Sequence, residues 1–377
     1  MASTYLSRTT GTPTNAKKFT ISGWFKIQSN DTADHQFFQH YTDISNREHM
    51  YFSTGNKLRF YCVDGGSTAV YLDTTRKLRD VNGWYHIVIA ADTTQSTASN
   101  RVKIYVNGVQ ETEFDTETYP AQDFNFKINT NNKSIVIGRY MGSDNYYYDG
   151  IISHYHFIDG TQYAASDFGS TDSTTGEWKI NTSPNVTYGN NGWFLFKDNA
   201  SVTDQSGEGN NWTTTAGTLT KTEDNSSNVF CTFNPLISVP SSSYANGNTK
   251  ATDGAGAHKS FYGTLGFTSG KYYWEAKATG GSKYTIGISD VENYINYTQV
   301  TNTNVIIGES SNSYGNGDAI GWYYNTLNKN GSAVASNIHT IVQNDIMMIA
   351  VDADNGKIYY GVNGTWRVAN STTFNAS

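Results

Sequence analysis

Two stretches of this sequence follow one plan: WYHIVIAADTTQSTASNRVKIYVNGV at residues 84–109 and DIMMIAVDADNGKIYYGVNGTW at residues 345–366. Each has an apolar strand, a polar loop that contains aspartate, an alternating strand and an Asn-Gly pair. Alternate positions of a strand share one face, so the outgoing strands should bury Val102, Ile104, Val106, Ile358, Tyr360 and Val362. Asn107-Gly108 and Asn363-Gly364 suit the positive φ angles of two-residue hairpin turns. The sequence therefore predicts one antiparallel β-sandwich around each stretch.

The composition favours an all-β fold. Aromatic residues make up 14% of the chain and charged residues only 16%, and no segment keeps the 3.6-residue period of a helix. The incoming strands, residues 85–90 and 346–351, are apolar on both faces, as in the middle of a sandwich. A length of 377 residues predicts two or three domains, each able to bury a core.

Charge and hydropathy exclude several classes of partner. The formal net charge is −7 and no run of Lys or Arg could displace the counterions of a nucleic acid, so we expect no nucleic-acid binding. No apolar run reaches membrane-spanning length, so we expect no membrane insertion. MASTYLSRTTGTP lacks the features of a signal peptide, which predicts synthesis in a cytoplasm and release by lysis. Cys62 and Cys231, the only cysteines, are expected to be small buried side chains.

The order of FTISGWFK, WYHIVIAAD, IYVNG, IVIGRY and YYDGIISHYHFIDG resembles a laminin-G-like, concanavalin-A-type jelly roll over residues 1–180. Residues 181–257 are rich in Asn, Ser and Thr and are expected to connect two domains. Within them, the apolar run at residues 193–196 is expected to return to the first sandwich as a strand. We therefore predict two tandem antiparallel β-sandwiches.

The continuation is similar to a family of tailed-phage structural proteins, especially from marine phages. The motifs that carry this resemblance are HFIDGTQYAASDFG, TGEWKI, NGWFLF, DQSGEGNNWT and FNPL. SGKYYWEAKA, YTIGISD, AIGWYYN and the second hairpin then resemble a SPRY-like sandwich over residues 258–377, which follows the jelly roll in that phage family. SPRY-like modules usually continue after such a hairpin, so this one is expected to be abbreviated or to continue past Ser377.

An acidic run after the first hairpin is the candidate for catalysis. Glu113, Asp115 and Glu117 would line one face of a strand at about 7 Å spacing. Paired carboxylates serve retaining glycosidases, and the ExDxE spelling resembles the catalytic strand of concanavalin-A-fold glucanases. Its place after a hairpin and the missing flanking Trp and Gly favour a solvated acidic edge strand instead. We therefore expect no enzymatic activity.

Metal sites are the second possibility. The laminin-G-like resemblance implies a calcium ion at the sandwich rim, for which Asp92 is the best match, together with Asp144 and Asp149. The alternative is that these aspartates cap their own turns. His154 and His156 alternate along one strand and could chelate a metal, but no further ligand is predicted nearby, so we do not expect zinc.

A tyrosine-rich loop is the candidate for carbohydrate binding. It places Tyr146, Tyr147 and Tyr148 beside Asp144 and Asn145, so flat rings adjoin groups that hold hydroxyls. The second module has a comparable set in Tyr294, Tyr297, Tyr314, Tyr323 and Tyr324. The alternative for these tyrosines is a place in the core or in a subunit contact.

The resemblance implies a non-enzymatic protein of the virion surface, such as a tail fibre, head fibre or appendage. We expect lectin-like adhesion to a host cell-surface glycan or protein, contacts with other virion proteins, and a homo-oligomer, for example a trimer, that gains avidity from several copies. A capsid or tail decoration protein without a ligand, and a polysaccharide-degrading glycoside hydrolase, are the alternatives. Such sandwiches host both adhesion and decoration, so the fold does not choose between them.

Overall fold

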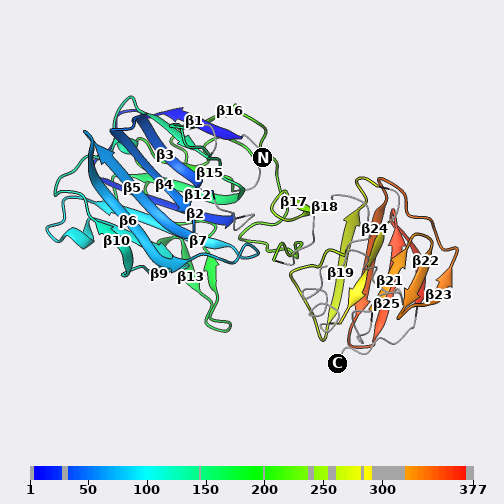
Figure 1. Ribbon diagram of the computed structural model, residues 1–377. Helices are drawn as coiled ribbons and strands as arrows, with labels where there is room; N and C mark the ends of the chain where they lie inside the picture. Colours follow the sequence, from blue (N-terminus) through cyan, green and yellow to red (C-terminus); the bar gives the residue numbers. More distant parts are fainter. Residues whose placement is uncertain are drawn as a thin grey trace. The chain divides into compact units, whose positions relative to one another are not determined.

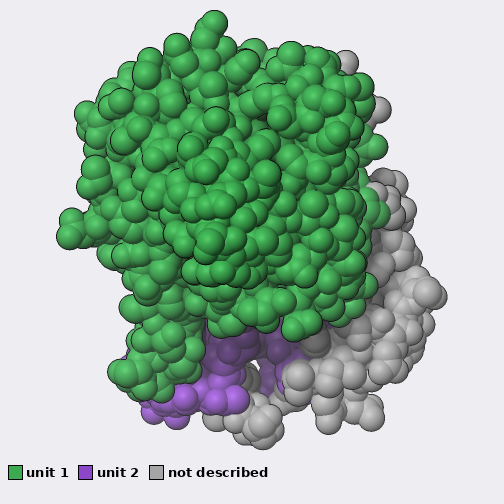
Figure 2. Space-filling model, turned by 90° about the vertical axis from the view of Figure 1, so that its left-hand side faces the viewer, with its two compact units in different colours: residues 1–230, 245–249 green, residues 231–244, 250–377 purple. Residues whose placement is uncertain are grey.

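The structure is a computed structural model that describes residues 4–27, 33–143, 146–197, 200–236, 242–253, 260–281, 284–290 and 319–370. The chain divides into two compact units, residues 1–230 with 245–249 and residues 231–244 with 250–377 (Figure 2). The helices among the described residues are three short 3-10 turns, η1 (Ala98–Asn100), η2 (Lys127–Asn129) and η3 (Ala165–Asp167). The prediction of an all-β fold is therefore confirmed.

Unit 1 contains an eight-stranded antiparallel sheet (Figure 1). Its strands, in spatial order, are β10 (Phe114–Thr118), β6 (Ser67–Lys77), β5 (Lys57–Asp64), β4 (Asn46–Ser53), β3 (His35–Asp43), β11 (Ser134–Ile137), β1 (Tyr5–Thr9) and β16 (Thr213–Ala216). Strands β3 to β6 follow one another in sequence and are neighbours in the sheet, so short hairpins connect them.

A six-stranded sheet forms the second layer of unit 1. Its strands are β15 (Trp193–Leu195), β12 (Gly150–Asp159), β2 (Lys18–Ile27), β7 (Tyr85–Asp92), β8 (Val102–Val106) and β9 (Val109–Gln110). The apolar run that begins at Trp193 thus lies in this sheet, beside β12. Unit 1 extends to residue 230 because strands after residue 180 complete both of its sheets.

Aromatic rings fill the core of unit 1. The Phe19 ring meets the edge of Phe126 at a centroid distance of 4.9 Å, and Trp193 does the same with Trp212 at 5.1 Å. All four side chains are almost completely buried. Edge-to-face pairs of this kind add specific attraction to the burial of apolar surface.

The outer face of the six-stranded sheet is covered as well. Val88, Ala90 and Ile158 pack against Phe168 and its neighbours in a second apolar cluster, to which β13 (Gly169–Thr171) and β14 (Trp178–Ile180) are adjacent. This cover explains why β7 is apolar on both faces. The outer face of the eight-stranded sheet has half-buried side chains along β5, so it is the more open of the two.

The two Asn-Gly turns have the predicted conformation. Asn107 and Gly108 have φ angles of 48° and 80°, and Asn363 and Gly364 have φ angles of 51° and 80°. The alternating strands also bury the predicted face, because all six of the residues listed for it are at most 2% exposed. Both hairpin predictions are confirmed.

Unit 2 contains two four-stranded antiparallel sheets. One consists of β19 (Lys271–Lys277), β24 (Ile346–Asp352), β25 (Lys357–Val362) and β26 (Thr365–Asn370), and the other of β20 (Thr285–Ser289), β21 (Ala319–Tyr323), β22 (Thr326–Lys329) and β23 (Ser332–Ser336). Trp322 and Tyr360 lie in its core, and the Tyr360 hydroxyl donates to the Ile320 carbonyl at 3.1 Å. The short strands β17 (Ser243–Ala245) and β18 (Lys250–Thr252) form a separate pair.

Cys62 is buried as predicted, but Cys231 is exposed. The prediction was wrong for Cys231 because this residue lies in a segment without regular strands, where no sheet covers it. Within the described part of the chain, no helix is long and apolar enough to cross a membrane.

Candidate functional site

The open face of the eight-stranded sheet carries polar and aromatic side chains in rows across the strands. In one row Gln39 of β3 lies opposite His49 of β4, which lies opposite Tyr61 of β5, and Tyr61 lies opposite Tyr71 of β6. Residues in register across a sheet project from the same face and contact one another. We call this surface the tyrosine face and define it as Gln39, Tyr41, Arg47, His49, Tyr51, Arg59, Tyr61, Tyr71, Tyr140 and Tyr146.

Stacked rings form the centre of the tyrosine face. The His49 ring lies between Tyr51 and Tyr140, with centroid distances of 4.9 Å and 5.4 Å and interplanar angles of 13° and 28°. The edges of Tyr41 and Tyr146 approach Tyr140 at 5.7 Å and 6.2 Å. The His49 and Tyr51 rings are buried, those of Tyr41 and Tyr140 are half-buried, and Tyr146 is 38% exposed, so the outer rings of this aromatic surface face solvent.

Arginines lie over the tyrosine rings. The Arg59 guanidinium is 5.5 Å from the ring centre of Tyr51 and 5.2 Å from that of Tyr71, and it pairs with Asp73 through two bonds of 3.0 Å and 3.1 Å. Arg47 lies 5.4 Å from the ring centre of Tyr61. Cation–π contacts of this kind fix the rings in place and leave positive charge beside them.

A closed loop brings Tyr146 to the face. The backbone N–H of Tyr140 donates to the Tyr146 carbonyl at 2.8 Å, and that of Tyr148 donates to Gly138 at 3.0 Å. Tyr147 lies beneath the guanidinium of Arg139, at 5.6 Å from its ring centre. Tyr146 and Tyr147, which the sequence predicts for sugar binding, are therefore both at the surface of this loop.

Tyr148 points the other way. Its hydroxyl donates towards the carbonyl oxygens of Lys26 and Ile151, each at 3.1 Å, and its ring meets the edge of Phe25 in the core. Burial raises the pKa of Tyr148 well above its ordinary value. The remaining members of the predicted sugar site, Asp144 and Asn145, lie outside the described residues.

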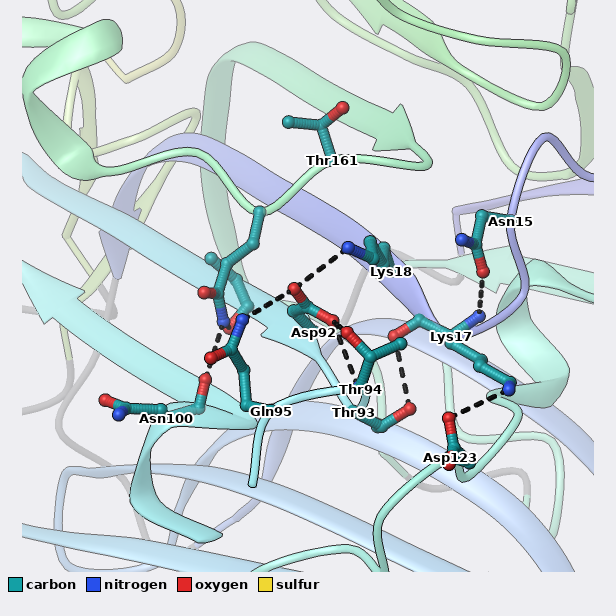
Figure 3. Close-up of polar contacts among 12 residues, drawn as sticks. Asn15, Lys17, Lys18, Asp92, Thr93, Thr94, Gln95, Asn100, Asp123 and Thr161 are labelled. Carbon is teal, nitrogen blue, oxygen red and sulfur yellow. Dashed lines mark hydrogen bonds and ion pairs between the residues drawn. The ribbon is translucent and has the colours of Figure 1, made fainter. Parts of the chain in front are cut away.

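Asp92, the best-placed candidate for calcium, has a full set of donors (Figure 3). One carboxylate oxygen accepts from the backbone N–H and the hydroxyl of Thr94 at 3.0 Å and 2.6 Å, and the other accepts from Gln95 at 2.9 Å. The Lys18 ammonium is 3.0 Å away. Burial acts to raise the pKa of Asp92, but these bonds together hold it at about 2. The Asp92 carboxylate thus caps the turn formed by Thr94 and Gln95, and it already has Lys18 as its cationic partner.

The predicted metal ligands do not come together. Asp92 lies in register with Lys18 at one end of β2, whereas Asp149 precedes Gly150, which is in register with Ile27 at the other end of the same strand. Asp144 falls outside the described residues. In the part of the chain that is described, no three His, Cys, Asp or Glu side chains form a group that could hold a metal ion.

The acidic run lies at a sheet edge. Asp115 and Glu117 belong to β10, the edge strand, while Glu113 precedes it, and all three are exposed. A bulge between Phe114 and Thr116 interrupts their alternation. The Asp115 carboxylate accepts from Lys57 and from the Thr75 hydroxyl, so it is held by neighbouring side chains on an open surface.

His154 and His156 are not arranged to bind one metal ion together. A bulge between Ser153 and His156 breaks the strand pattern, and His154 has a φ of 46°. Nδ1 of His154 is 2.8 Å from the Ser153 hydroxyl, and Nδ1 of His156 is 2.8 Å from the Tyr188 hydroxyl. Burial holds the pKa of His156 well below its usual value, which fits a neutral ring packed beneath the covering segment.

Unit 2 has an exposed aromatic group that the sequence analysis missed. Trp366 meets the edges of Tyr273 and Tyr359 at 6.2 Å and 6.4 Å, and Tyr273 and Trp366 are 53% and 48% exposed. The period-two alternation of YYWEAK was the available signal, since it puts Tyr273 on the face opposite Trp274, which is half-buried and packs against the core. Of the tyrosines predicted for this unit, Tyr323 and Tyr324 end β21 or follow it, and Tyr294, Tyr297 and Tyr314 lie outside the described residues.

Comparison with known proteins supports the fold of unit 1. Residues 2–164 match the family described as the concanavalin A-like lectin/glucanases superfamily, which confirms the predicted jelly roll. No curated protein matches this chain.

Solved structures resemble the chain only distantly. A candidate carbohydrate-binding protein of Bacteroides ovatus has a TM-score of 0.37 at 15% identity, over 57% of this chain and 56% of that one. A heptameric SAP-like pentraxin of Limulus polyphemus has a TM-score of 0.32 at 15% identity, over 42% and 71% of the two chains. The enzymatically active domain of bacteriophage CBA120 tailspike protein 2 has a TM-score of 0.29 at 15% identity, over 43% and 24%. At these scores the likenesses carry no argument about function.

Proposed function

We propose that this chain is a non-enzymatic adhesin that binds a glycan through the tyrosine face of unit 1. The observation that carries the proposal is the row of stacked rings from Tyr51 through His49 to Tyr140, extended by the exposed ring of Tyr146. Sugar rings pack their C–H faces on aromatic side chains, while polar groups beside the rings hold the hydroxyls. The match of residues 2–164 to a superfamily of lectins and glucanases agrees with this chemistry.

We further propose that the protein acts on the surface of a tailed-phage virion and binds a glycan or protein of the host cell. The order of motifs through FNPL, followed by motifs that resemble a SPRY-like module, supports this context. A single open site on a sheet face binds weakly, so adhesion would depend on several copies in a homo-oligomer, for example a trimer, held by other virion proteins.

A glycan array probed with the purified chain tests the adhesin. Tyr146→Ala and Tyr140→Ala should each reduce binding to the glycans that the unchanged protein retains, because each removes a ring from the face. Tyr272→Ala is the matched control, since it removes a tyrosine that is 43% exposed in unit 2 and belongs to neither candidate set of tyrosines. Equal loss in the control, or no glycan bound by the unchanged protein, would refute the proposal.

Decoration of the capsid or tail is the second candidate, because exposed rings such as Trp366 also suit contacts between subunits. Antibody labelling of virions by cryo-electron microscopy separates the two. Label on fibres or at the tail tip supports adhesion, and a regular pattern over the capsid supports decoration. Hydrolysis of a β-glucan that is lost in Glu113→Gln would contradict the non-enzymatic assignment.

A further inference from the structure

Three buried polar atoms on the tyrosine face have no hydrogen-bond partner among the described residues. They are Nε2 of Gln39, Nε of Arg47 and Nε2 of His49. Gln39 lies directly opposite His49 in the pairing of β3 with β4, and Arg47 precedes His49 by two residues on the same face. Buried polar atoms are rarely left unpaired in folded proteins, so three of them in adjacent positions indicate a place for a bound group.

Gln39 and His49 offer complementary atoms. Nδ1 of His49 is 3.2 Å from Oε1 of Gln36, an acceptor, so the ring proton is on Nδ1 and Nε2 is an acceptor. Burial, reinforced by Arg47 and Arg59, lowers the pKa of His49 to about 3, which keeps the ring neutral. Oε1 of Gln39 accepts from the backbone N–H of Met141 at 3.3 Å, which leaves its Nε2 as a donor. One donor beside one acceptor matches a hydroxyl group.

Arg47 supplies an uncompensated positive charge. No carboxylate lies within ion-pair distance of it among the described residues, whereas the guanidinium of Arg59 is neutralised by Asp73. Arg47 donates to the Ile44 carbonyl and lies over Tyr61. It is also near Tyr140, where burial raises the pKa of the hydroxyl and Arg47 acts against that rise. A planar guanidinium beside aromatic rings suits a carboxylate ligand.

We propose that these residues form a subsite for an acidic sugar, a pyranose with a carboxylate group. Arg47 binds the carboxylate, Gln39 and His49 bind one ring hydroxyl between them, and Tyr140 with Tyr146 packs against the face of the sugar. The unpaired atoms are enclosed in the unliganded protein, so the Tyr140 ring turns away from His49 when the sugar enters. This subsite rests on the proposed function and specifies its ligand.

Calorimetric titration of the whole chain with methyl glucuronoside and with methyl glucoside tests the subsite, because the two probes differ in the carboxylate. The acidic probe should bind about tenfold more tightly, and Arg47→Gln should abolish that preference. Arg367→Gln, at an exposed arginine of unit 2, should keep it. Equal affinity for the two sugars would overturn the acidic subsite and leave the adhesin standing. No binding of either sugar, together with an empty glycan array, would overturn both.

A second variant tests the hydroxyl contact. His49→Phe keeps a ring between Tyr51 and Tyr140 but removes the Nε2 acceptor, so it should weaken binding of both sugars about tenfold. It also removes the Nδ1 bond to Gln36, so the melting temperature should fall, and circular dichroism checks that the variant is folded at the temperature of the titration. Unchanged affinity in this variant would show that His49 makes no contact with the sugar. NMR signals of the Tyr140 ring, assigned through Tyr140→Phe, should shift on addition of the acidic probe, and unshifted signals would contradict the turning of that ring.

Discussion

The side-chain oxygen of Asn107 accepts a hydrogen bond from the backbone N–H of His86 at 2.8 Å, and Asn363 accepts the same bond from Ile346 at 2.9 Å in unit 2. In both turns the asparagine N–H also donates to the carbonyl of that same partner, at 2.8 Å and 3.0 Å. Asparagine therefore has two roles in each hairpin. It tolerates the positive φ, and its side chain satisfies a strand N–H at the point where the pairing ends.

Replacement of Asn107 tests the second role. Asn107→Ala should lower the free energy of unfolding by about 1–3 kcal/mol, because it leaves the His86 N–H without its acceptor and puts alanine at a positive φ. Asn56→Ala is the matched control, since Asn56 has a φ of 66° and its side chain makes no hydrogen bond in the described structure. Urea unfolding of both variants measures the difference. Equal losses would show that the side-chain bond contributes nothing.

The buried side chain of His86 should make the protein less stable in acid. Nδ1 of His86 accepts from the Trp178 indole N–H at 3.0 Å, so Nε2 carries the proton and bonds with the Ser22 hydroxyl at 2.9 Å. Burial lowers the pKa of His86 from 6.5 to about 3. In the unfolded protein His86 is protonated below pH 6.5, whereas in the folded protein it stays neutral down to about pH 3. The free energy of unfolding therefore falls by about 1.4 kcal/mol for each pH unit below 6.5 across this window. His86→Phe should flatten the pH dependence measured by thermal unfolding.

Glu48 has the opposite effect over part of that range. Its two carboxylate oxygens accept from the backbone N–H groups of Lys127 and Ile128 at 2.7 Å and 2.8 Å, at the start of η2. Burial raises the pKa of Glu48 from 4.5 to about 7, so its folded form binds a proton first as the pH falls. Protonation of Glu48 should therefore raise the free energy of unfolding as the pH falls from 7 to 4.5, which offsets part of the loss caused by His86. Glu48→Gln should therefore steepen the loss between pH 6.5 and 4.5, and an unchanged slope would contradict this assignment.

Calcium should not raise the melting temperature of the unchanged protein, because the Lys18 ammonium already lies beside Asp92. Lys18→Met should destabilise unit 1 by about 1–3 kcal/mol, since it leaves a largely buried carboxylate without its cation. Differential scanning calorimetry with calcium and with a chelator checks both statements. Stabilisation of the unchanged protein by calcium would show that the ion displaces Lys18.

The hairpins were predictable because the signals for them are local. Alternation and an Asn-Gly pair lie within one short stretch, and they specify both the turn and the buried face. The tyrosine face has no such signal. Gln39, His49, Tyr61 and Tyr71 meet only through three successive strand registers, and each register contains a bulge or depends on a hairpin length that the sequence does not state.

Local sequence signals also predict part of the tyrosine-rich loop. Tyr146 and Tyr147 lie in an exposed loop, as a run of polar neighbours predicts, but Tyr148 starts the return to β12 and enters the core. Three adjacent tyrosines cannot all face solvent when the chain turns back into a sheet. Sequence alone gives no reason to choose which of them is buried.

A buried long-range ion pair in unit 1 gives the last prediction. The Lys26 ammonium and the Asp224 carboxylate are 2.8 Å apart and at most 1% exposed, although the residues are separated by 198 positions. Asp224 also accepts from the Trp84 indole N–H at 3.4 Å and from the Phe230 N–H at 3.0 Å, so this pair ties the segment before residue 230 to the six-stranded sheet.

Lys26→Met should cost about 3–5 kcal/mol, because it leaves a buried carboxylate without a counter-charge. The double variant Lys26→Met with Asp224→Asn should recover part of this loss, since the asparagine oxygen can still accept from Trp84 and Phe230 while no charge is left buried. Urea unfolding measures both, and limited proteolysis should cut next to Lys221 faster in the single variant than in the double one. Asp224→Asn alone completes the cycle. If the losses of the two single variants sum to that of the double variant, the ion pair contributes no coupling, and apolar packing alone holds the segment on the sheet.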